Sequence, residues 1–127
     1  MKGLLDTHAF IWCDSEPGKL SATAAAFVQD PGNTVLVSVV SVWEMLIKQQ
    51  LGKMNLRLPL GSIIAQQQTN GMQILPVNLD HVLALEKLPA LHKDPFDRLL
   101  IAQATVEGAV LISLDPVFKQ YPAQVLW

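Results

Sequence analysis

The apolar positions of the chain form two kinds of pattern that alternate along its length. Short unbroken apolar runs, typical of buried parallel strands, lie at 2–6, 34–37, 73–75 and 109–113, with a possible edge strand at 124–127. The segments between them repeat apolar residues every three or four positions, which predicts helices at about 8–13, 21–29, 41–51, 59–70, 79–86 and 95–107. Strands that alternate with helices predict an α/β fold with a parallel, doubly wound sheet, formed by one domain over residues 1–127.

Four acidic residues occupy positions that such a sheet brings to one edge. Asp6 and Asp115 each close an apolar strand, whereas Glu44 and Asp97 fall in the first turns of predicted helices. The carboxyl end of a strand and the start of the following helix lie on the same edge of an open α/β sheet, where ligands bind. Because carboxylates held close together repel one another, the pattern favours a hard divalent cation between them.

Two of these acids also have a purely structural explanation. Ser41 and Glu44 have the spacing of a capping box, and Asp94 can cap the helix in which Asp97 is the third residue. Asp97, however, shares its helical face with apolar residues that are expected to point inward, Ile101 and Ala104. A charge on a buried face requires a partner, so a metal ion or its bound water remains the better explanation for Asp97.

The composition limits the class of protein. Half of the 127 residues are hydrophobic and 16% are charged, which is apolar enough to suggest a covered surface, and the helix at 41–51 has more apolar residues than one buried face needs. We therefore expect a homodimer. A net charge of −2 argues against a general electrostatic affinity for nucleic acid. No apolar run reaches the roughly 18 residues of a membrane span, no signal peptide is evident, and Cys13 is the only cysteine, so we expect a cytoplasmic protein.

The four acids lie in strings that together resemble one family. The strings are LLDTHAFIW at 4–12, SVVSVWEMLIK at 38–48 followed by Gly52 and Lys53, HKDPFDRLLIAQA at 92–104, and LISLDPVF at 111–118. In order and spacing they resemble PIN-domain proteins of the VapC toxin type, over nearly the whole chain. The resemblance implies a PIN-like three-layer fold, with helices on both sides of a five-stranded parallel sheet in the order 3-2-1-4-5. It also implies a prokaryotic endoribonuclease dependent on Mg²⁺ or Mn²⁺, the toxin of a type II toxin–antitoxin pair, inhibited by a small antitoxin protein.

The resemblance assigns roles to individual residues. Its acidic site corresponds to Asp6, Glu44, Asp97 and Asp115, of which Asp115 matches the family's most variable position. We expect Asp6 and Asp97 to be the principal metal ligands, with the other two acids acting through water or on a second ion. The hydroxyl residues that match the surroundings of the metal in the family are Thr7 and Ser113.

Several basic residues are candidates for a rim that contacts RNA. Lys48, Lys53 and Arg57 lie in a stretch without an acid directly after the Glu44 helix, and His92 precedes the Asp97 helix. For the lysines, a solvated helix end is an equally good interpretation. Arg98 could orient a carboxylate or contact a phosphate, and support of the fold is the preferred interpretation.

Two other functions use an aspartate after the first strand. A magnesium-dependent phosphohydrolase of the haloacid-dehalogenase kind needs a second acid two positions after Asp6, where this chain has His8. A receiver-like, non-enzymatic binding module needs an acidic pair near the first strand and a lysine after the last one. Neither stands at the required position, so the metal-dependent nuclease is preferred.

Overall fold

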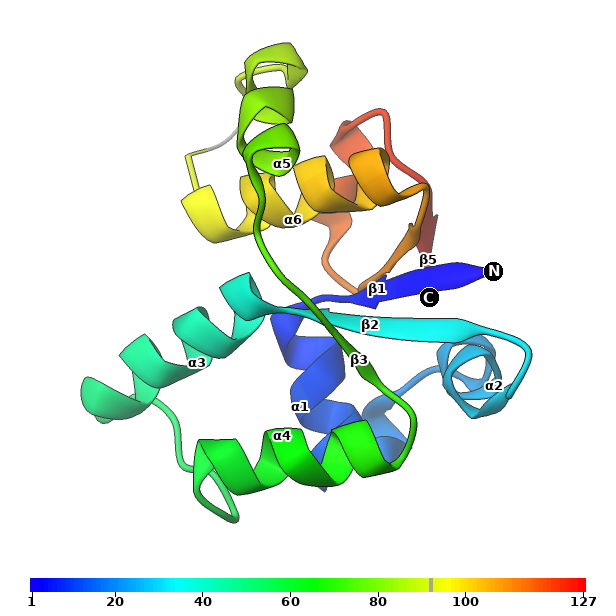
Figure 1. The fold of residues 1–127 in the computed structure, drawn as a ribbon, viewed down its shortest axis with the longest axis vertical. Coiled ribbons are helices and arrows are strands. Elements are labelled where there is room, and N and C mark those ends of the chain that lie inside the picture. Colours follow the sequence, from blue (N-terminus) through cyan, green and yellow to red (C-terminus); the bar gives the residue numbers. More distant parts are fainter. Residues whose placement is uncertain (92) are drawn as a thin grey trace.

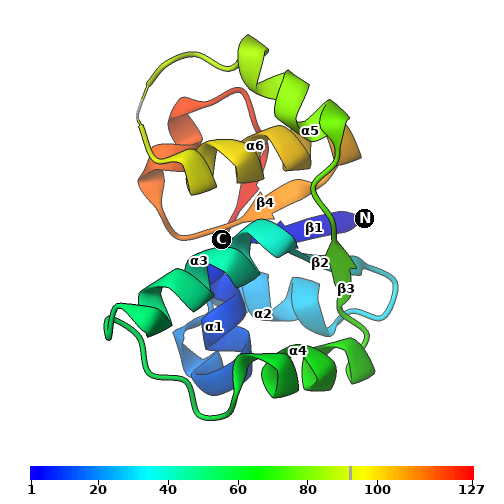
Figure 2. The same cartoon turned by 60° about the vertical axis from the view of Figure 1, so that its left-hand side comes forward.

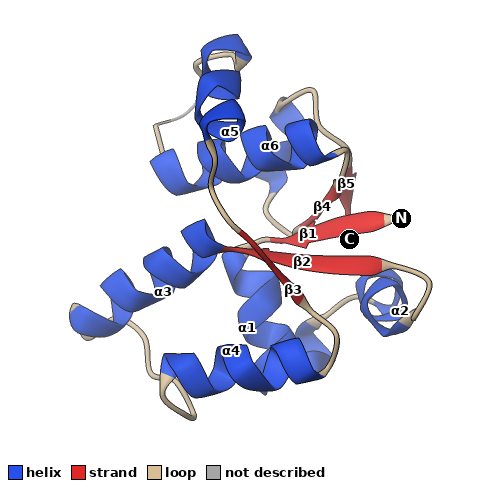
Figure 3. Ribbon diagram, viewed as in Figure 1, coloured by secondary structure: helices blue, strands red, loops and turns tan. Residues whose placement is uncertain are grey.

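The computed structural model describes residues 1–91 and 93–127, which form one five-stranded sheet (Figures 1 and 3). The strand order is β3-β2-β1-β4-β5 and every pairing is parallel. This confirms the predicted sheet. The strands are β1 (Lys2–Leu5), β2 (Thr34–Ser38), β3 (Gln73–Leu75), β4 (Val110–Ile112) and β5 (Val125–Leu126).

Six α-helices connect these strands and cover the sheet in layers. In Figure 1, α5 and α6 lie above the sheet and α1, α2 and α4 lie below it, while α3 extends away from the carboxyl end of β2. Figure 2 shows the same layers after a turn of the molecule. The helices are α1 (Thr7–Ser15), α2 (Ala22–Gln29), α3 (Val39–Gln50), α4 (Leu60–Thr69), α5 (Leu79–Ala84) and α6 (Pro95–Glu107), and short 3₁₀ turns lie at η1 (Pro17–Lys19), η2 (Leu85–Lys87) and η3 (Pro116–Gln120).

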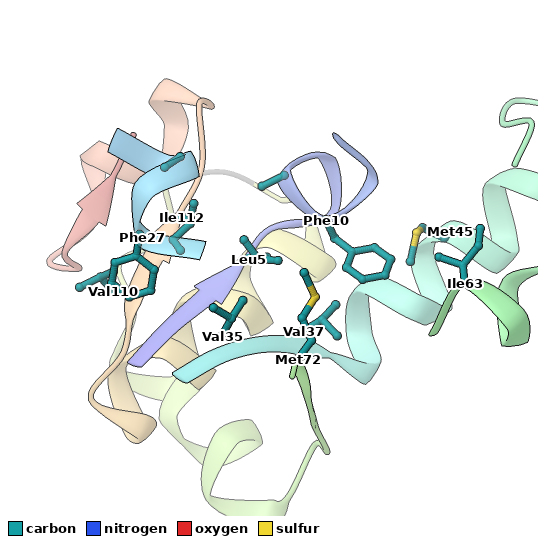
Figure 4. Packing of buried hydrophobic residues seen from close by; sticks show 12 residues of the cluster. Leu5, Phe10, Phe27, Val35, Val37, Met45, Ile63, Met72, Val110 and Ile112 are labelled. Carbon is teal, nitrogen blue, oxygen red and sulfur yellow. The ribbon is translucent and has the colours of Figure 1, made fainter. Parts of the chain in front are cut away.

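The two faces of the sheet face two separate cores, because successive residues of a strand point to opposite sides. Leu5 packs with the α1, α2 and α4 side, whereas its neighbour Leu4 packs with the α6 side, and both are fully buried. Figure 4 shows the first core, in which Phe10 of α1, Met45 of α3 and Ile63 of α4 come together. Apolar contacts of α3 with α1 and α4 therefore fix the direction in which α3 leaves the sheet.

Two glycines are required by geometry. A Cβ atom at Gly3 would lie 2.4 Å from a ring carbon of Phe27, so only glycine lets α2 approach β1 this closely. Gly108 ends α6 with a φ of 63°, a left-handed conformation that glycine adopts without strain. The chain then turns directly into β4, as the sequence predicted.

None of the helices in the ranges 1–91 and 93–127 combines the length and the apolar character needed to cross a membrane.

The central strand β1 places the candidate site. It pairs with β2 on one side and with β4 on the other, so the strand order reverses between β1 and β4. Open α/β sheets form their ligand crevice at such a switch point, outside the carboxyl ends of the strands. Asp6 follows β1 directly, and Ser113 follows β4 directly.

Candidate metal centre

Asp6 is a buried carboxylate that also begins a helix. The sequence predicted it as the last residue of the first strand, but β1 ends at Leu5 and Asp6 is the N-cap of α1. One carboxylate oxygen accepts a hydrogen bond from the Ala9 amide at 2.7 Å, and the other accepts one from Ser113 Oγ at 2.5 Å. Only 6% of Asp6 is exposed. The capping role is therefore real, but it uses only one of the two oxygens.

Burial raises the pKa of Asp6 above its ordinary value, because desolvation penalises the charged form. The bonds from Ser113 and Ala9 and the charge of His8 act in the opposite direction, and the negative charge of Asp115 adds a further, smaller increase. Within residues 1–91 and 93–127, no lysine or arginine forms a salt bridge with Asp6. A bound cation would supply this missing positive charge.

Glu44 lies on α3, and its local structure differs from the sequence prediction. The helix begins at Val39 with Ser38 as its N-cap, so the predicted capping box from Ser41 to Glu44 is wrong. The reason is that the Ser38 hydroxyl accepts from the Val40 amide at 3.0 Å, so the helix is capped three residues earlier. Glu44 consequently stands in the second turn, and capping does not explain it.

The Glu44 carboxylate is 9% exposed and is held by two side chains. Thr7 Oγ1 donates to Glu44 Oε1 at 2.7 Å, and Lys48 Nζ lies 3.0 Å from Glu44 Oε2. Ser41, one turn before Glu44 and fully buried, has its hydroxyl oxygen 3.1 Å from Thr7 Oγ1. Since Thr7 follows Asp6, these hydroxyls connect the acid on α3 to the end of β1. The spacing of Ser41 and Glu44 suggested a cap and did not reveal this contact, although the position of Ser41 one turn before Glu44 was a usable signal.

Asp97 stands in the first turn of α6, as predicted. Asp94 is the N-cap of this helix and accepts from the amides of Phe96 and Asp97, at 2.9 and 3.1 Å, so the predicted cap is confirmed. Asp97 itself is half-buried, and the residues that share its face, Ile101 and Ala104, are buried as expected. The ring of Phe96 meets Trp43 edge-on, with ring centroids 5.1 Å apart. The first turn of α6 therefore lies beside the part of α3 that bears Glu44.

Asp115 is exposed and lies three residues beyond β4, because that strand ends at Ile112 rather than at the acid. Its side chain accepts from the Val117 amide at 3.0 Å and so begins η3. Its own amide donates to Ser113 Oγ at 3.0 Å, the same hydroxyl that bonds Asp6. The fully buried Ser113 thus connects the two aspartates across neighbouring strands.

The acids supply hard oxygen ligands, the type that Mg²⁺ and Mn²⁺ prefer. In the described part of the chain, however, no three His, Cys, Asp or Glu side chains are close enough together to hold an ion. Thr7, the residue after Asp6, donates to Glu44, and Ser113 bonds both Asp6 and the backbone of Asp115, whose side chain is exposed. The donor set and the buried charge of Asp6 therefore fit a divalent cation, provided that side chains move inward when it binds.

The predicted basic rim is only partly near these acids. Lys48 pairs with Glu44, and Lys53 is exposed after α3. Arg57 belongs elsewhere, because its guanidinium bonds both carboxylate oxygens of Asp14, at 2.9 and 2.6 Å, near the end of α1 opposite Asp6. Along a helix, eight residues span about 12 Å, so Arg57 fastens the loop before α4 and does not border the acids. His92 lies outside the described residues.

Arg98 has a structural role. Its guanidinium donates to the carbonyl oxygen of Pro89 at 2.8 Å and to the hydroxyl of Tyr121 at 3.3 Å. These contacts fasten the start of α6 to the segments on either side of it. From the sequence, support of the fold is preferred for Arg98 over a contact with phosphate.

The fold and the site together define a class: a parallel α/β domain with carboxylates at the switch point of its sheet. The PIN domain model matches residues 3–124, and the chain therefore belongs to the PIN domain family. The family that the sequence motifs suggested is thus confirmed. No curated protein sequence matches this chain significantly.

Solved structures with the same fold come from toxin–antitoxin complexes. A chain of VapBC2 from Rickettsia felis, bound to a DNA fragment from the promoter, has a TM-score of 0.73 at 15% identity, with 99% of this chain and 98% of that chain covered. A chain of VapBC-1 from nontypeable Haemophilus influenzae has a TM-score of 0.67 at 21% identity, with coverages of 99% and 97%. A toxin–antitoxin complex from Klebsiella pneumoniae gives 0.60 at 17% identity, with coverages of 98% and 96%. At these identities the likeness establishes a shared fold.

Proposed function

We propose that this protein is a metal-dependent endoribonuclease and the toxin of a type II toxin–antitoxin pair, acting in a prokaryotic cytoplasm. Its membership of the PIN domain family and the toxin–antitoxin origin of its structural neighbours support this function. The single observation that carries the metal dependence is Asp6, a buried carboxylate without a lysine or arginine partner in the described residues. A cation beside Asp6 would favour its charged form and offset the desolvation that burial imposes.

The proposed chemistry divides between the ion and the protein. The ion, Mg²⁺ or Mn²⁺, would be held by Asp6, Glu44, Asp97 and Asp115. When bound, such an ion lowers the pKa of its water ligand and neutralises negative charge on the phosphate. The hydroxyls of Thr7 and Ser113 orient two of these carboxylates by donating hydrogen bonds to them. Lys48 supplies a positive charge at the edge of the site, where a phosphate of the RNA can approach.

Cleavage of RNA tests this proposal directly. The purified protein, free of antitoxin, is incubated with structured and unstructured RNAs in Mn²⁺, Mg²⁺ or EDTA. We expect cleavage with either metal and none in EDTA, and we expect Asp6→Asn and Asp97→Asn to abolish it. Asp80→Asn is the matched control, because Asp80 is exposed on α5. If folded wild-type protein cleaves none of a broad RNA panel in metal, the nuclease assignment is wrong.

The acids at the switch point of the sheet also support inhibition by an antitoxin that inserts a basic side chain. A buried negative charge without a basic partner attracts arginine or lysine, and an arginine can bond a carboxylate through two nitrogens. We propose that the C-terminal segment of the antitoxin enters here and competes with the metal. Mn²⁺ affinity that is undiminished in the antitoxin complex would exclude this mode of inhibition.

The exposed face of α3 supports the proposed homodimer. Val39, Trp43 and Leu46 repeat at helical spacing and are 43%, 57% and 42% exposed, which leaves an apolar stripe on the surface. Leu46→Arg is expected to convert the dimer to a monomer in light scattering, whereas Val106→Arg, at a similarly exposed position on α6, leaves it unchanged. A wild-type protein that is monomeric at high micromolar concentration would refute the dimer.

A further inference from the structure

A buried glutamine on α6 lies at the centre of a polar network. Gln103 is fully buried, as are Ser38 at the end of β2 and His81 on α5. Gln103 Oε1 accepts from Ser38 Oγ at 2.5 Å, and Gln103 Nε2 lies 3.2 Å from the Pro76 carbonyl oxygen and 3.3 Å from His81 Nδ1. One amide therefore bonds two segments that are distant from it in sequence, the end of β2 and residues 76–81. The mainly apolar sequence around these residues did not predict this network.

The donors and acceptors of this network allow only one arrangement. His81 Nδ1 accepts from the Asn78 amide at 3.1 Å, so the ring proton is on Nε2, which donates to Glu107 at 2.9 Å. The NH₂ end of the Gln103 side chain must then face His81. In the reversed orientation the Gln103 oxygen would face two acceptors, the Pro76 carbonyl oxygen and His81 Nδ1. The Gln103 oxygen is thereby fixed towards Ser38. Every member has a partner, and such a network has one geometry.

The network is attached to the start of the helix that bears Glu44. Ser38 is the N-cap of α3: its hydroxyl accepts from the Val40 amide at 3.0 Å while it donates to Gln103. Glu44 follows Ser38 by six residues, and Asp97 precedes Gln103 by six residues, about 9 Å along each helix. The two helices run in opposite directions here (Figure 1). The Gln103 contact is thus equally far from both acids.

A second contact lies at the other end of the same two segments. The edge-on contact between Trp43 and Phe96 joins residues that directly precede Glu44 and Asp97. An aromatic pair alone permits sliding, because its energy varies slowly with offset, whereas a hydrogen bond weakens steeply with distance and angle. The bond between Ser38 and Gln103 therefore sets the register of α3 against α6.

We propose that Gln103 is a positioning residue that holds Glu44 and Asp97 at the separation needed for metal binding. This role rests on the proposed function of the carboxylates. Gln103 does not itself touch the metal or the RNA. His81 and Glu107 serve by fixing the orientation of the Gln103 amide.

The test replaces Gln103 by methionine, which keeps the length of the side chain and removes its hydrogen bonds. Gln67→Met is the matched control. Gln67 is also a buried glutamine, 8% exposed, but it bonds Asp14 near the end of α1 that is opposite Asp6. Two quantities are measured on protein shown to be folded: the Kd for Mn²⁺, and the hydrogen exchange of the first turn of α3 in EDTA. For Gln103→Met we expect the Kd to rise and the exchange to accelerate, each at least tenfold. For Gln67→Met we expect changes below twofold.

The two measurements separate this proposal from the proposed function. If the wild type binds no Mn²⁺, the metal-dependent function fails, and exchange in EDTA still shows whether Gln103 holds α3. If Gln103→Met leaves both quantities at the wild-type values, the positioning role is refuted. Should Gln103→Met fail to fold, Ser38→Ala removes the same link, and Ser21→Ala, which removes the cap of α2, controls for the loss of a cap. Equal Mn²⁺ affinity in Ser38→Ala and Ser21→Ala would also overturn the proposal.

Discussion

Replacing Thr7 by valine tests the hydroxyl link between Asp6 and Glu44. Valine has nearly the shape of threonine, so the change removes one hydroxyl and leaves the packing of this 4%-exposed side chain in place. The lost bond is the 2.7 Å contact from Thr7 Oγ1 to the buried Glu44 carboxylate. Lys48 would then be the remaining side-chain partner of Glu44. The Lys48 side chain is one-third exposed, so solvent partly screens this ion pair.

The expected loss of stability follows from the type of bond. A hydrogen bond to a charged group contributes about 1.5–3 kcal/mol when the remaining partner stays buried. For 127 residues the entropy of unfolding is about 0.27 kcal/mol per kelvin, so Thr7→Val should lower the Tm by about 6–11 °C. Thr7→Ser retains the hydroxyl and loses one methyl group, for which about 1 kcal/mol is expected.

Thermal denaturation of the metal-free protein at pH 7 provides the assay. The two variants are compared with the wild type, and Thr7→Val is repeated in a Glu44→Gln background. There the acceptor is neutral, so the loss should fall to about 0.5–1.5 kcal/mol. If Thr7→Val destabilises the protein no more than Thr7→Ser does, or by the same amount with and without the Glu44 charge, the link does not hold Glu44.

Three further predictions concern charged and titratable groups, two of them at the site and one, Cys13, at the far end of α1. Burial raises the pKa of Asp6, so the folded state retains the Asp6 proton more strongly, and the stability this confers is complete below the unfolded pKa of about 3.9 and is lost as the pH rises through the folded pKa. Asp6→Asn should therefore be more stable than metal-free wild type at pH 7 and similar at low pH, as measured by thermal denaturation in EDTA; a variant that is less stable at pH 7 would show that the capping charge dominates. Burial also raises the pKa of Cys13 to about 11, so a thiol reagent at pH 8 should modify folded protein about 100-fold more slowly than unfolded protein, and equal rates would contradict the burial. Lys48→Met should tighten Mn²⁺ binding, because the ammonium no longer competes for Glu44, and should weaken RNA binding; calorimetry that shows no gain in Mn²⁺ affinity would mean that Lys48 does not occupy a ligand position.

Burial of Asp6, more than repulsion among the acids, is the reason to expect that Asp6→Asn stabilises the metal-free protein. If mutual repulsion among the four acids were the main cost, neutralising any one of them would stabilise the metal-free protein. In the structure, desolvation is the larger cause of the raised pKa of Asp6, and the charge of Asp115 is a minor one. The predicted direction is unchanged, but the effect should persist when Asp115 is neutralised as well.

Local signals in the sequence were sufficient to predict the strands and helices and to select the acids as candidates, whereas the strand order followed from the family resemblance. Unbroken apolar runs mark strands that are buried on both faces, and residues such as Asp94 and Gly108 end or begin helices through contacts within a few positions. The order of the motifs then indicated the family. These features depend on short-range chemistry, which is why they can be predicted without the tertiary structure.

Only the tertiary structure decided how the acids are held. Ser38, not Ser41, is the cap of α3, and its hydroxyl also bonds Gln103, a residue 65 positions away. The place of Arg57 likewise depends on Asp14, which is 43 positions away in the chain. Hydrogen bonds between distant segments leave no periodic signal in the sequence, because each needs only one correctly placed polar atom on either side. The sequence thus indicated which residues are candidates for the chemistry, and only packing determined which side chains contact them.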